Sequence, residues 1–315
     1  QPNAARNDGP FATVTKAQDA VRKMAKPADR PVVVMVRGGM YFLDQALRFG
    51  PDDSGTAKAP VVYQAYPGER PVFSGGRVLR DWRVTPEGRW QVQLDDVKNG
   101  AWWFAQLFVA DRRCYRPRLP EQGYYQIADK APPTERAEKK GFDRFKYAGD
   151  DIRAEWAKTP DVEIMAFHEW TTTRSWIAQV DAQEHTVTLT GHTPSASSWS
   201  ALNKGGRYLV ENAPEALKQP GQWYLDRRQG LLTYIPRPGE TPQQTPVIAP
   251  RLERLLALAG AVGEHRWVQH LVFRGLVFAH TNWVMTPQGQ AFPQAEINLD
   301  AAISPVAARQ AAVDS

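Results

Sequence analysis

The chain has 315 residues, including 25 Pro, 23 Gly and 11 Trp, and a formal net charge of +5. The many turn residues favour short strands over long helices, and the scattered Lys and Arg argue against a nucleic-acid-binding arm or a polybasic membrane patch. Cys114 is the only cysteine, which excludes an intramolecular disulfide, and no apolar run reaches the roughly 20 residues that span a bilayer.

The clearest helix is predicted over residues 13–25. Val14 and Val21 belong to an apolar series at helical spacing, and Thr15 with Gln18 fits a capping box. Pro27 follows directly and cannot continue a helix. A helix placed before the first strand could cover the exposed edge of a sheet.

Short β-branched and aromatic runs follow the helix, at residues 32–36, 61–66 and 71–73. Tight corners rich in Gly, Pro and Asp separate them. Continuous apolar strands of this kind indicate a sheet that is buried on its inner side. Residues 1–80 are therefore predicted to form an N-terminal cap and the first coils of a β-structure.

The pattern changes over residues 81–246. Apolar and polar residues alternate around Trp90 and around Val187, which is typical of half-buried antiparallel strands. Residues 223–225 and 231–235 flank a turn and predict a hairpin. Residues 81–246 are predicted to form a separate antiparallel β-rich module.

The earlier pattern returns over residues 247–315. Short apolar strands are predicted at residues 247–248, 255–258 and 271–278, the last interrupted by a bend at Arg274-Gly275. A strand, a bend and a second strand are what one coil of a β-solenoid requires. Solenoids need closing caps, and residues 298–315 predict none. We therefore expect the natural protein to continue with further coils after Ser315.

A series of short motifs runs through the chain in order. They include Gly9-Pro10-Phe11-Ala12-Thr13, Val36-Arg37-Gly38-Gly39-Met40-Tyr41, Phe49-Gly50-Pro51-Asp52-Asp53-Ser54-Gly55-Thr56, Tyr66-Pro67-Gly68-Glu69-Arg70-Pro71, Arg118-Leu119-Pro120, Arg207-Tyr208-Leu209-Val210-Glu211-Asn212, Trp223-Tyr224-Leu225-Asp226 and Phe273-Arg274-Gly275-Leu276. Together they closely resemble bacterial right-handed parallel β-helix proteins similar to glycoside hydrolase family 141. The resemblance covers nearly the whole chain.

The resemblance implies a mainly β protein with a pectin-lyase-like, right-handed parallel β-helix, an N-terminal capping helix and an inserted β-sandwich-like domain. It implies hydrolysis of plant cell-wall polysaccharide, with fucosidase- or xylanase-like activity, in the periplasm or outside the cell. It also places the catalytic carboxylates on later coils that this chain does not contain. We therefore expect this chain alone to show weak or no turnover.

Four carboxylates within the chain are nevertheless candidates for the catalytic pair. Glycosidic hydrolysis uses two carboxyl groups, about 5 Å apart in retaining enzymes and roughly 6.5 to 9.5 Å apart in inverting ones. The candidates that lie beside other polar and aromatic residues are Glu169, Glu211, Glu296 and Asp300. The alternative, which we favour for any one of them, is an ordinary surface or turn carboxylate.

Two groups of residues are candidates for substrate binding because each follows a predicted strand, where loops commonly carry binding residues. An indole offers a flat apolar face to a sugar ring, and His, Asn or Arg can hydrogen-bond its hydroxyls. The groups are His168, Trp170 and Arg174 after residues 162–167, and His280, Asn282 and Trp283 after residues 276–278. Alternatively, both could be polar corners in which the Trp covers local core.

No metal or other cofactor is expected for this chain. The six His residues include no pair at the spacing of a zinc-binding helix, and no Asp-rich calcium motif occurs. Two alternatives to a hydrolase stay open: a non-catalytic carbohydrate-binding or surface module, and a polysaccharide lyase. The expected partner is a polysaccharide or oligosaccharide in each case.

Overall fold

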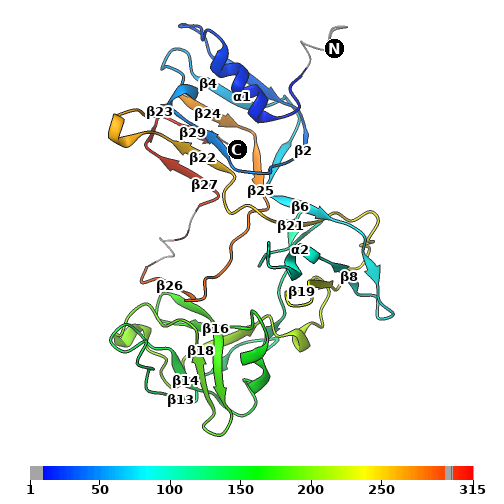
Figure 1. The fold of residues 1–315 in the computed structure, drawn as a ribbon, viewed down its shortest axis with the longest axis vertical. Helices are drawn as coiled ribbons and strands as arrows, with labels where there is room; N and C mark the ends of the chain where they lie inside the picture. The colour runs from blue at the N-terminus through cyan, green and yellow to red at the C-terminus, as the bar shows by residue number, and fades with distance from the viewer. Residues whose placement is uncertain (1–9, 295–298, 300, 315) are drawn as a thin grey trace. The chain divides into compact units, whose positions relative to one another are not determined.

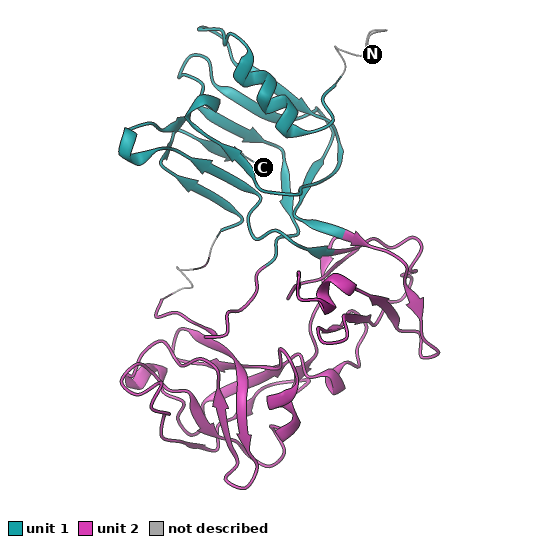
Figure 2. Ribbon diagram, in the orientation of Figure 1, with its two compact units in different colours: residues 1–77, 249–282, 300–315 teal, residues 78–248, 283–299 magenta. Residues whose placement is uncertain are grey.

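The computed structural model describes residues 10–294, 299 and 301–314, which form two compact units (Figures 1 and 2). Unit 1 contains residues 1–77, 249–282 and 300–315, and unit 2 contains residues 78–248 and 283–299. In the sequence, unit 2 is therefore inserted between stretches of unit 1. Both units consist mainly of β-strands, as predicted, with parallel and antiparallel sheets.

Helix α1 (Val14–Lys23) opens unit 1. The hydroxyl of Thr13 caps it by accepting a hydrogen bond from the Lys16 amide at 3.2 Å, and Thr13 has the extended backbone that an N-cap requires. The capping box expected from Thr15 and Gln18 is therefore wrong. The helix starts two residues earlier than that motif suggests, and the side chain of Gln18 is turned inward.

A buried carboxylate ties α1 to the rest of unit 1. Asp53, at the end of the 3-10 turn η1 (Pro51–Asp53), is 1% exposed. Arg22 donates to Asp53 at 2.8 Å and Gln18 donates to it at 3.1 Å. Val21 on the same face of the helix belongs to the hydrophobic core, so polar and apolar contacts hold α1 in one position.

All but one of the strands of unit 1 pair in parallel ladders. The strands are β1 (Val32–Val36), β2 (Gly39–Phe42), β3 (Leu47–Phe49), β4 (Val61–Ala65), β5 (Pro71–Ser74), β6 (Gly76–Leu79), β22 (Leu256–Ala259), β23 (Val268–Gln269), β24 (Leu271–Arg274), β25 (Val277–Ala279), β27 (Ile303–Val306), β28 (Ala308–Arg309) and β29 (Ala312–Asp314). The parallel ladders run β1-β4-β24-β29, β2-β5-β25, β27-β22-β3 and β23-β28. A further 3-10 turn, η5 (Val262–Glu264), joins β22 and β23.

The insertion does not interrupt this pairing. Val61 of β4 is the register partner of Leu271 of β24, and Val72 of β5 is the partner of Val277 of β25. Each of the two ladders thus continues after the chain returns from unit 2. The bend predicted between β24 and β25 is confirmed, with Gly275 at a φ of +64° that favours glycine.

Stacked aromatic rings fill the core of unit 1. Phe273 lies 5.0 Å from Phe49 and 5.6 Å from Tyr63 between ring centroids, and all three rings are at most 2% exposed. Phe73 and Phe278, from the next ladder, make a second contact at 5.5 Å. Inward-facing aromatic residues at matching register positions therefore link successive passes of the chain.

Unit 2 is built from antiparallel strands. They are β7 (Arg83–Val84), β8 (Trp90–Gln93), β9 (Phe108–Val109), β10 (Arg112–Arg113), β11 (Arg118–Leu119), β12 (Tyr125–Gln126), β13 (Asp129–Lys130), β14 (Arg144–Lys146), β15 (Glu163–Phe167), β16 (Thr172–Asp181), β17 (Thr186–Leu189), β18 (Arg207–Glu211), β19 (Trp223–Asp226), β20 (Leu231–Tyr234), β21 (Val247–Pro250) and β26 (Gln290–Ala291). Its helices are short: α2 (Asp95–Lys98), η2 (Ala154–Lys158), η3 (Ser198–Ser200) and η4 (Pro214–Ala216).

The largest sheet of unit 2 has nine strands in the order β11-β18-β15-β16-β17-β14-β13, with β12 on β18 and β26 on β16. One face of its central strands buries Ile164, Tyr208 and Val210 in the core. The predicted hairpin is also present, because Trp223 pairs with Tyr234 across β19 and β20.

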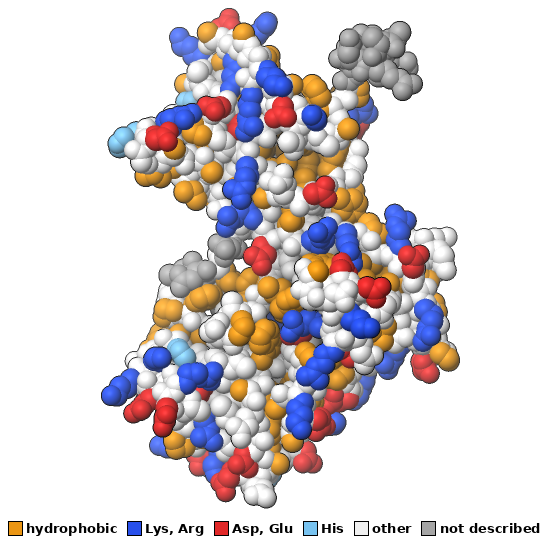
Figure 3. Space-filling model, in the orientation of Figure 1, with side chains coloured by type: hydrophobic (Ala, Val, Ile, Leu, Met, Phe, Trp, Pro, Cys, Tyr) orange, Lys and Arg blue, Asp and Glu red, His pale blue; other side chains and the backbone are white. Residues whose placement is uncertain are grey.

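Charged side chains are mixed over the surface. On the face drawn in Figure 3, Lys and Arg side chains alternate with Asp and Glu. In the described part of the chain, no helix has the length and apolar character needed to cross a bilayer.

Candidate functional site

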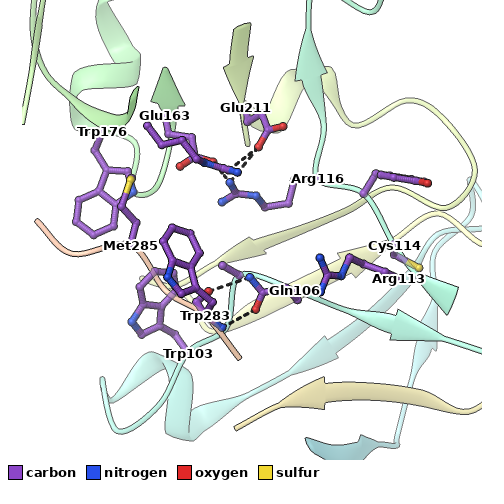
Figure 4. A pocket seen from close by; sticks show the side chains of 13 residues that line it. Trp103, Gln106, Arg113, Cys114, Arg116, Glu163, Trp176, Glu211, Trp283 and Met285 are labelled. Carbon is purple, nitrogen blue, oxygen red and sulfur yellow. Dashed lines mark hydrogen bonds and ion pairs between the residues drawn. The ribbon is translucent and has the colours of Figure 1, made fainter. Parts of the chain in front are cut away.

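The candidate site is a pocket of about 170 Å³ that lies within unit 2 (Figure 4). Its walls are three indoles, two carboxylates, three guanidinium groups and a few smaller groups. The lining residues are Trp103, Ala105, Gln106, Arg113, Cys114, Tyr115, Arg116, Glu163, Arg174, Trp176, Glu211, Trp283 and Met285. They come from the nine-stranded sheet and from the region of the β9–β10 hairpin. Trp283 and Met285 come from the segment after β25, where the chain returns to unit 2.

The register of the nine-stranded sheet brings the charged residues together. Glu163 on β15 stands opposite Glu211 on β18, and also opposite Trp176 on β16. Opposed residues point to the same face of an antiparallel sheet. Because Ile164 and Val210 occupy the core face, Glu163 and Glu211 project from the other face into the pocket.

Two arginines bridge the two carboxylates. Arg116 Nη2 donates to Glu211 at 3.2 Å, and Arg174 Nη2 donates to Glu211 at 2.8 Å. Both Nη2 groups also bind Glu163, which is only 1% exposed. Two like charges directly opposed on neighbouring strands would repel, so the arginines are what make this pairing stable.

Arg116 is charged at neutral pH although it is buried. Burial lowers the pKa of Arg116 to about 10, while the nearby Glu211 carboxylate favours the charged form. A pKa of about 10 still leaves Arg116 protonated at pH 7. The two guanidinium groups then balance the two carboxylates, so the cluster has no net formal charge.

Trp103 and Trp283 lie across the pocket from the two carboxylates, and Trp176 stands on the sheet beside Glu163 (Figure 4). Trp103 and Trp176 lie 6.3 Å apart between ring centroids, and the Arg227 guanidinium stacks 4.1 Å above Trp103. The Gln106 amide holds the backbone of Trp283 through two hydrogen bonds, at 2.8 Å to its carbonyl and 2.9 Å from its N–H. These contacts support Trp103 and the backbone of Trp283.

The structure brings three of the predicted site residues together. Arg174, Glu211 and Trp283 all line this pocket, and the Arg174 guanidinium lies 6.0 Å from the centre of the Trp283 ring. Arg174 and Trp283 were expected in two separate binding groups.

Other predicted residues of unit 2 lie outside the pocket. The His168 ring is partly buried and shares a 2.8 Å hydrogen bond with the Thr173 hydroxyl. Trp170 is 53% exposed and stacks on Trp199 at 4.6 Å, and its indole N–H donates to the Pro293 carbonyl at 3.0 Å. Glu169 is an exposed residue beside them.

The remaining predicted residues belong to unit 1 or cannot be placed. His280 and Asn282 are buried in unit 1, where the His280 ring lies 2.9 Å from the Ser74 hydroxyl and the backbone N–H of Asn282 donates to the Leu252 carbonyl at 2.8 Å. They do not line the pocket of unit 2. Glu296 and Asp300 lie outside the described residues.

Several residues of the pocket were not predicted. Glu163 begins a strand, where a charged residue is common, and only its pairing with Glu211 reveals its burial. Arg116 lies in a stretch without periodicity. Trp103 belongs to the aromatic run at residues 102–104, which sequence patterns assign to the core. Among the described residues, no three His, Cys, Asp or Glu side chains are grouped so that they could hold a metal ion.

Burial of His168 should make the stability of unit 2 depend on pH. Burial lowers the pKa of its imidazole from 6.5 to about 4, so the folded protein keeps the ring neutral while the unfolded chain takes up a proton. The free energy of unfolding should therefore fall as the pH drops from 6.5 to 4. His168→Gln should make this decline shallower, as measured by urea unfolding at a series of pH values. Equal declines in the two proteins would contradict the assignment.

Comparisons with known proteins describe the fold. No protein-family model matches the chain, and no curated protein matches it. A solved structure described as a glycoside hydrolase is similar, with a TM-score of 0.70 and 24% sequence identity over 90% of this chain and 50% of that chain. The chain therefore shares the fold of part of that structure. It spans half the length of that structure.

A second solved structure is described as the complex structure of XylC with xylose. Its TM-score is 0.36 and its identity is 11%, over 87% of this chain and 33% of that chain. A similarity this weak supports no argument about the present chain.

Proposed function

We propose that this chain is part of a glycoside hydrolase that acts on plant cell-wall polysaccharide, with fucosidase- or xylanase-like activity, in the periplasm or outside the cell. We propose further that the pocket of unit 2 binds one sugar residue of the substrate. The observation that carries the proposal is that three indole rings and an Arg–Glu network line the same pocket. The similarity to a glycoside hydrolase supports the class of reaction.

The chemistry of the pocket suits a sugar ring. A pyranose has apolar C–H faces that can stack on an indole, and its hydroxyls both donate and accept hydrogen bonds. Trp283 offers an aromatic face, while Gln106 and the Arg–Glu network offer polar groups around it. A volume of about 170 Å³ corresponds to about five or six water molecules. That is room for one small ring and not for a long oligosaccharide.

The paired carboxylates of this pocket do not suit the catalytic pair. A general acid must hold a proton near neutral pH, which requires a raised pKa. Each of Glu163 and Glu211 is bound by two guanidinium groups, so neither carboxyl group is free to give a proton to a leaving group. We therefore propose that the catalytic carboxylates lie on later coils and that this pocket positions the substrate.

The architecture of unit 1 supports this placement. We propose that unit 1 is the beginning of a right-handed parallel β-helix, with α1 as its cap and unit 2 as the inserted domain. Its parallel ladders each take one strand from successive passes of the chain, and stacked aromatic rings link those passes. Stacking of this kind is how β-solenoids bury their cores.

A non-catalytic carbohydrate-binding module is the second candidate, because the pocket can bind a sugar without any catalytic group. The release of reducing ends from polysaccharide by the longer protein distinguishes the two. A lyase would instead yield an unsaturated product that absorbs ultraviolet light.

The Trp283→Ala variant tests the binding proposal. It removes one aromatic face of the pocket, so we expect its affinity for xylo-oligosaccharides or fucosylated cell-wall oligosaccharides to fall at least tenfold. That loss corresponds to roughly 1.4 kcal/mol of binding free energy. Calorimetric titration of the whole chain measures it. Trp170→Ala is the matched control, because Trp170 is an exposed indole outside the pocket. Equal affinities for the wild type and Trp283→Ala would contradict the proposal.

A further inference from the structure

One cation of the pocket, Arg113, has no charged partner in the described part of the chain. Arg113 on β10 lines the pocket beside Gln106 (Figure 4). Its guanidinium lies 5.7 Å from the centre of the Phe108 ring, which holds the side chain over the β9–β10 hairpin. Among the residues that the structure describes, it forms no ion pair. Arg116 and Arg174, in contrast, are each bound to two carboxylates.

This leaves the pocket with a positive charge. Three arginines and two glutamates line it, so their formal charges sum to +1. The Arg116–Arg174–Glu163–Glu211 cluster is neutral as a whole, and the excess charge therefore belongs to Arg113. Arg113 is exposed to solvent, so it is free to meet a ligand without breaking an existing ion pair.

We infer that the pocket selects a sugar residue that carries an acidic group, with Arg113 binding the acidic group and the indoles of the pocket binding the sugar ring. This inference rests on the proposed sugar-binding role of the same pocket and adds the substrate class. A guanidinium binds a carboxylate or a sulfate through parallel hydrogen bonds from its planar fork. Uronic acids and sulfated sugars share this chemistry.

The adjacent arginine provides a matched control. Arg112 and Arg113 are neighbours on β10, so their side chains point to opposite faces of the strand. Both are exposed, but Arg112 does not line the pocket. Arg112→Gln and Arg113→Gln therefore remove the same charge from the same strand, and only the second changes the pocket.

The test compares three trisaccharides of similar size by calorimetric titration of the whole chain at low salt. One is a galacturonic acid trimer, one is a sulfated galactose trimer and one is a neutral galactose trimer. We expect at least one acidic trimer to bind about fivefold more tightly than the neutral trimer, the effect of one partly exposed ion pair. Arg113→Gln should abolish this preference and Arg112→Gln should keep it. The preference should also shrink as salt is added.

Each outcome has a definite meaning. Preference for the uronate alone, or for the sulfated sugar alone, supports the inference and identifies the acidic group. If the neutral trimer binds as tightly as both acidic trimers, and Trp283→Ala weakens that binding, the pocket binds sugars but the inference of acid selectivity is wrong. The same conclusion follows if both arginine variants lose the preference equally. If none of the trimers binds, this inference is wrong, and the titration of Trp283→Ala with xylo-oligosaccharides or fucosylated oligosaccharides decides the sugar-binding role separately.

Discussion

Replacing Arg116 with methionine is expected to lower the free energy of unfolding by about 3 to 5 kcal/mol, the usual cost of removing one partner from a buried charge network. Methionine fills a similar space, so the loss would come mainly from the charges. Glu163 is 1% exposed and stands opposite Glu211, and Arg174 alone would have to balance both carboxylates. Urea unfolding followed by tryptophan fluorescence measures the change.

Two further variants separate charge from packing. Arg112→Gln removes an exposed arginine that lies outside the pocket, on β10, so it should change the free energy of unfolding by less than about 0.5 kcal/mol. The double variant Arg116→Met with Glu163→Gln removes one charge of each sign, so it should recover at least half of the loss. If the single Arg116 variant is as stable as the wild type, the network does not hold the sheet face together.

Phe273→Ala should be similarly costly in unit 1, at about 3 to 5 kcal/mol, because a large side chain is removed from a packed core. The Phe273 ring is 2% exposed and touches Phe49, Tyr63 and Phe278, so it links strands from three passes of the chain. The cavity would lie where the ladder on β24 continues after the insertion. Urea unfolding, together with hydrogen exchange of the β4 and β24 amides, reports the loss.

Arg274→Ala is the control for this prediction. Arg274 is the next residue on β24, and its ion pair with Asp314 at 3.3 Å is exposed at both ends. Exposed pairs contribute little, so the free energy of unfolding should change by less than about 1 kcal/mol. A small effect of Phe273→Ala, with amide protection in β4 unchanged, would show that the aromatic stack does not hold the passes together.

The positions of many strands could be predicted from the sequence, but their pairing could not. Residues 32–36 form β1 as expected, and the hairpin of β19 and β20 is present, because apolar and alternating patterns are local signals. The pairing of Val61 with Leu271 joins residues from opposite sides of a long insertion. No local pattern records such a register, which depends on how the returning chain packs against earlier strands.

In the candidate site, too, single residues could be predicted from the sequence but their grouping could not. Arg174 and Trp283 were singled out by residue type and by their position after predicted strands, and Glu211 was singled out as a carboxylate beside polar and aromatic residues. Their grouping was not foreseen, because it depends on the register of β15 with β16 and β18. Arg116 had no sequence signal at all, since its role is defined by two carboxylates that lie far from it in the chain.

Residues 283–299 belong to unit 2, and this limits how the chain can be shortened to unit 2 alone. A protein made only from residues 78–248 would lack Trp283 and β26. The Gln106 amide would lose both of its backbone partners, and β16 would lose a neighbouring strand. A trimmed expression product that preserves the pocket must therefore carry both stretches, joined by a linker in place of residues 249–282.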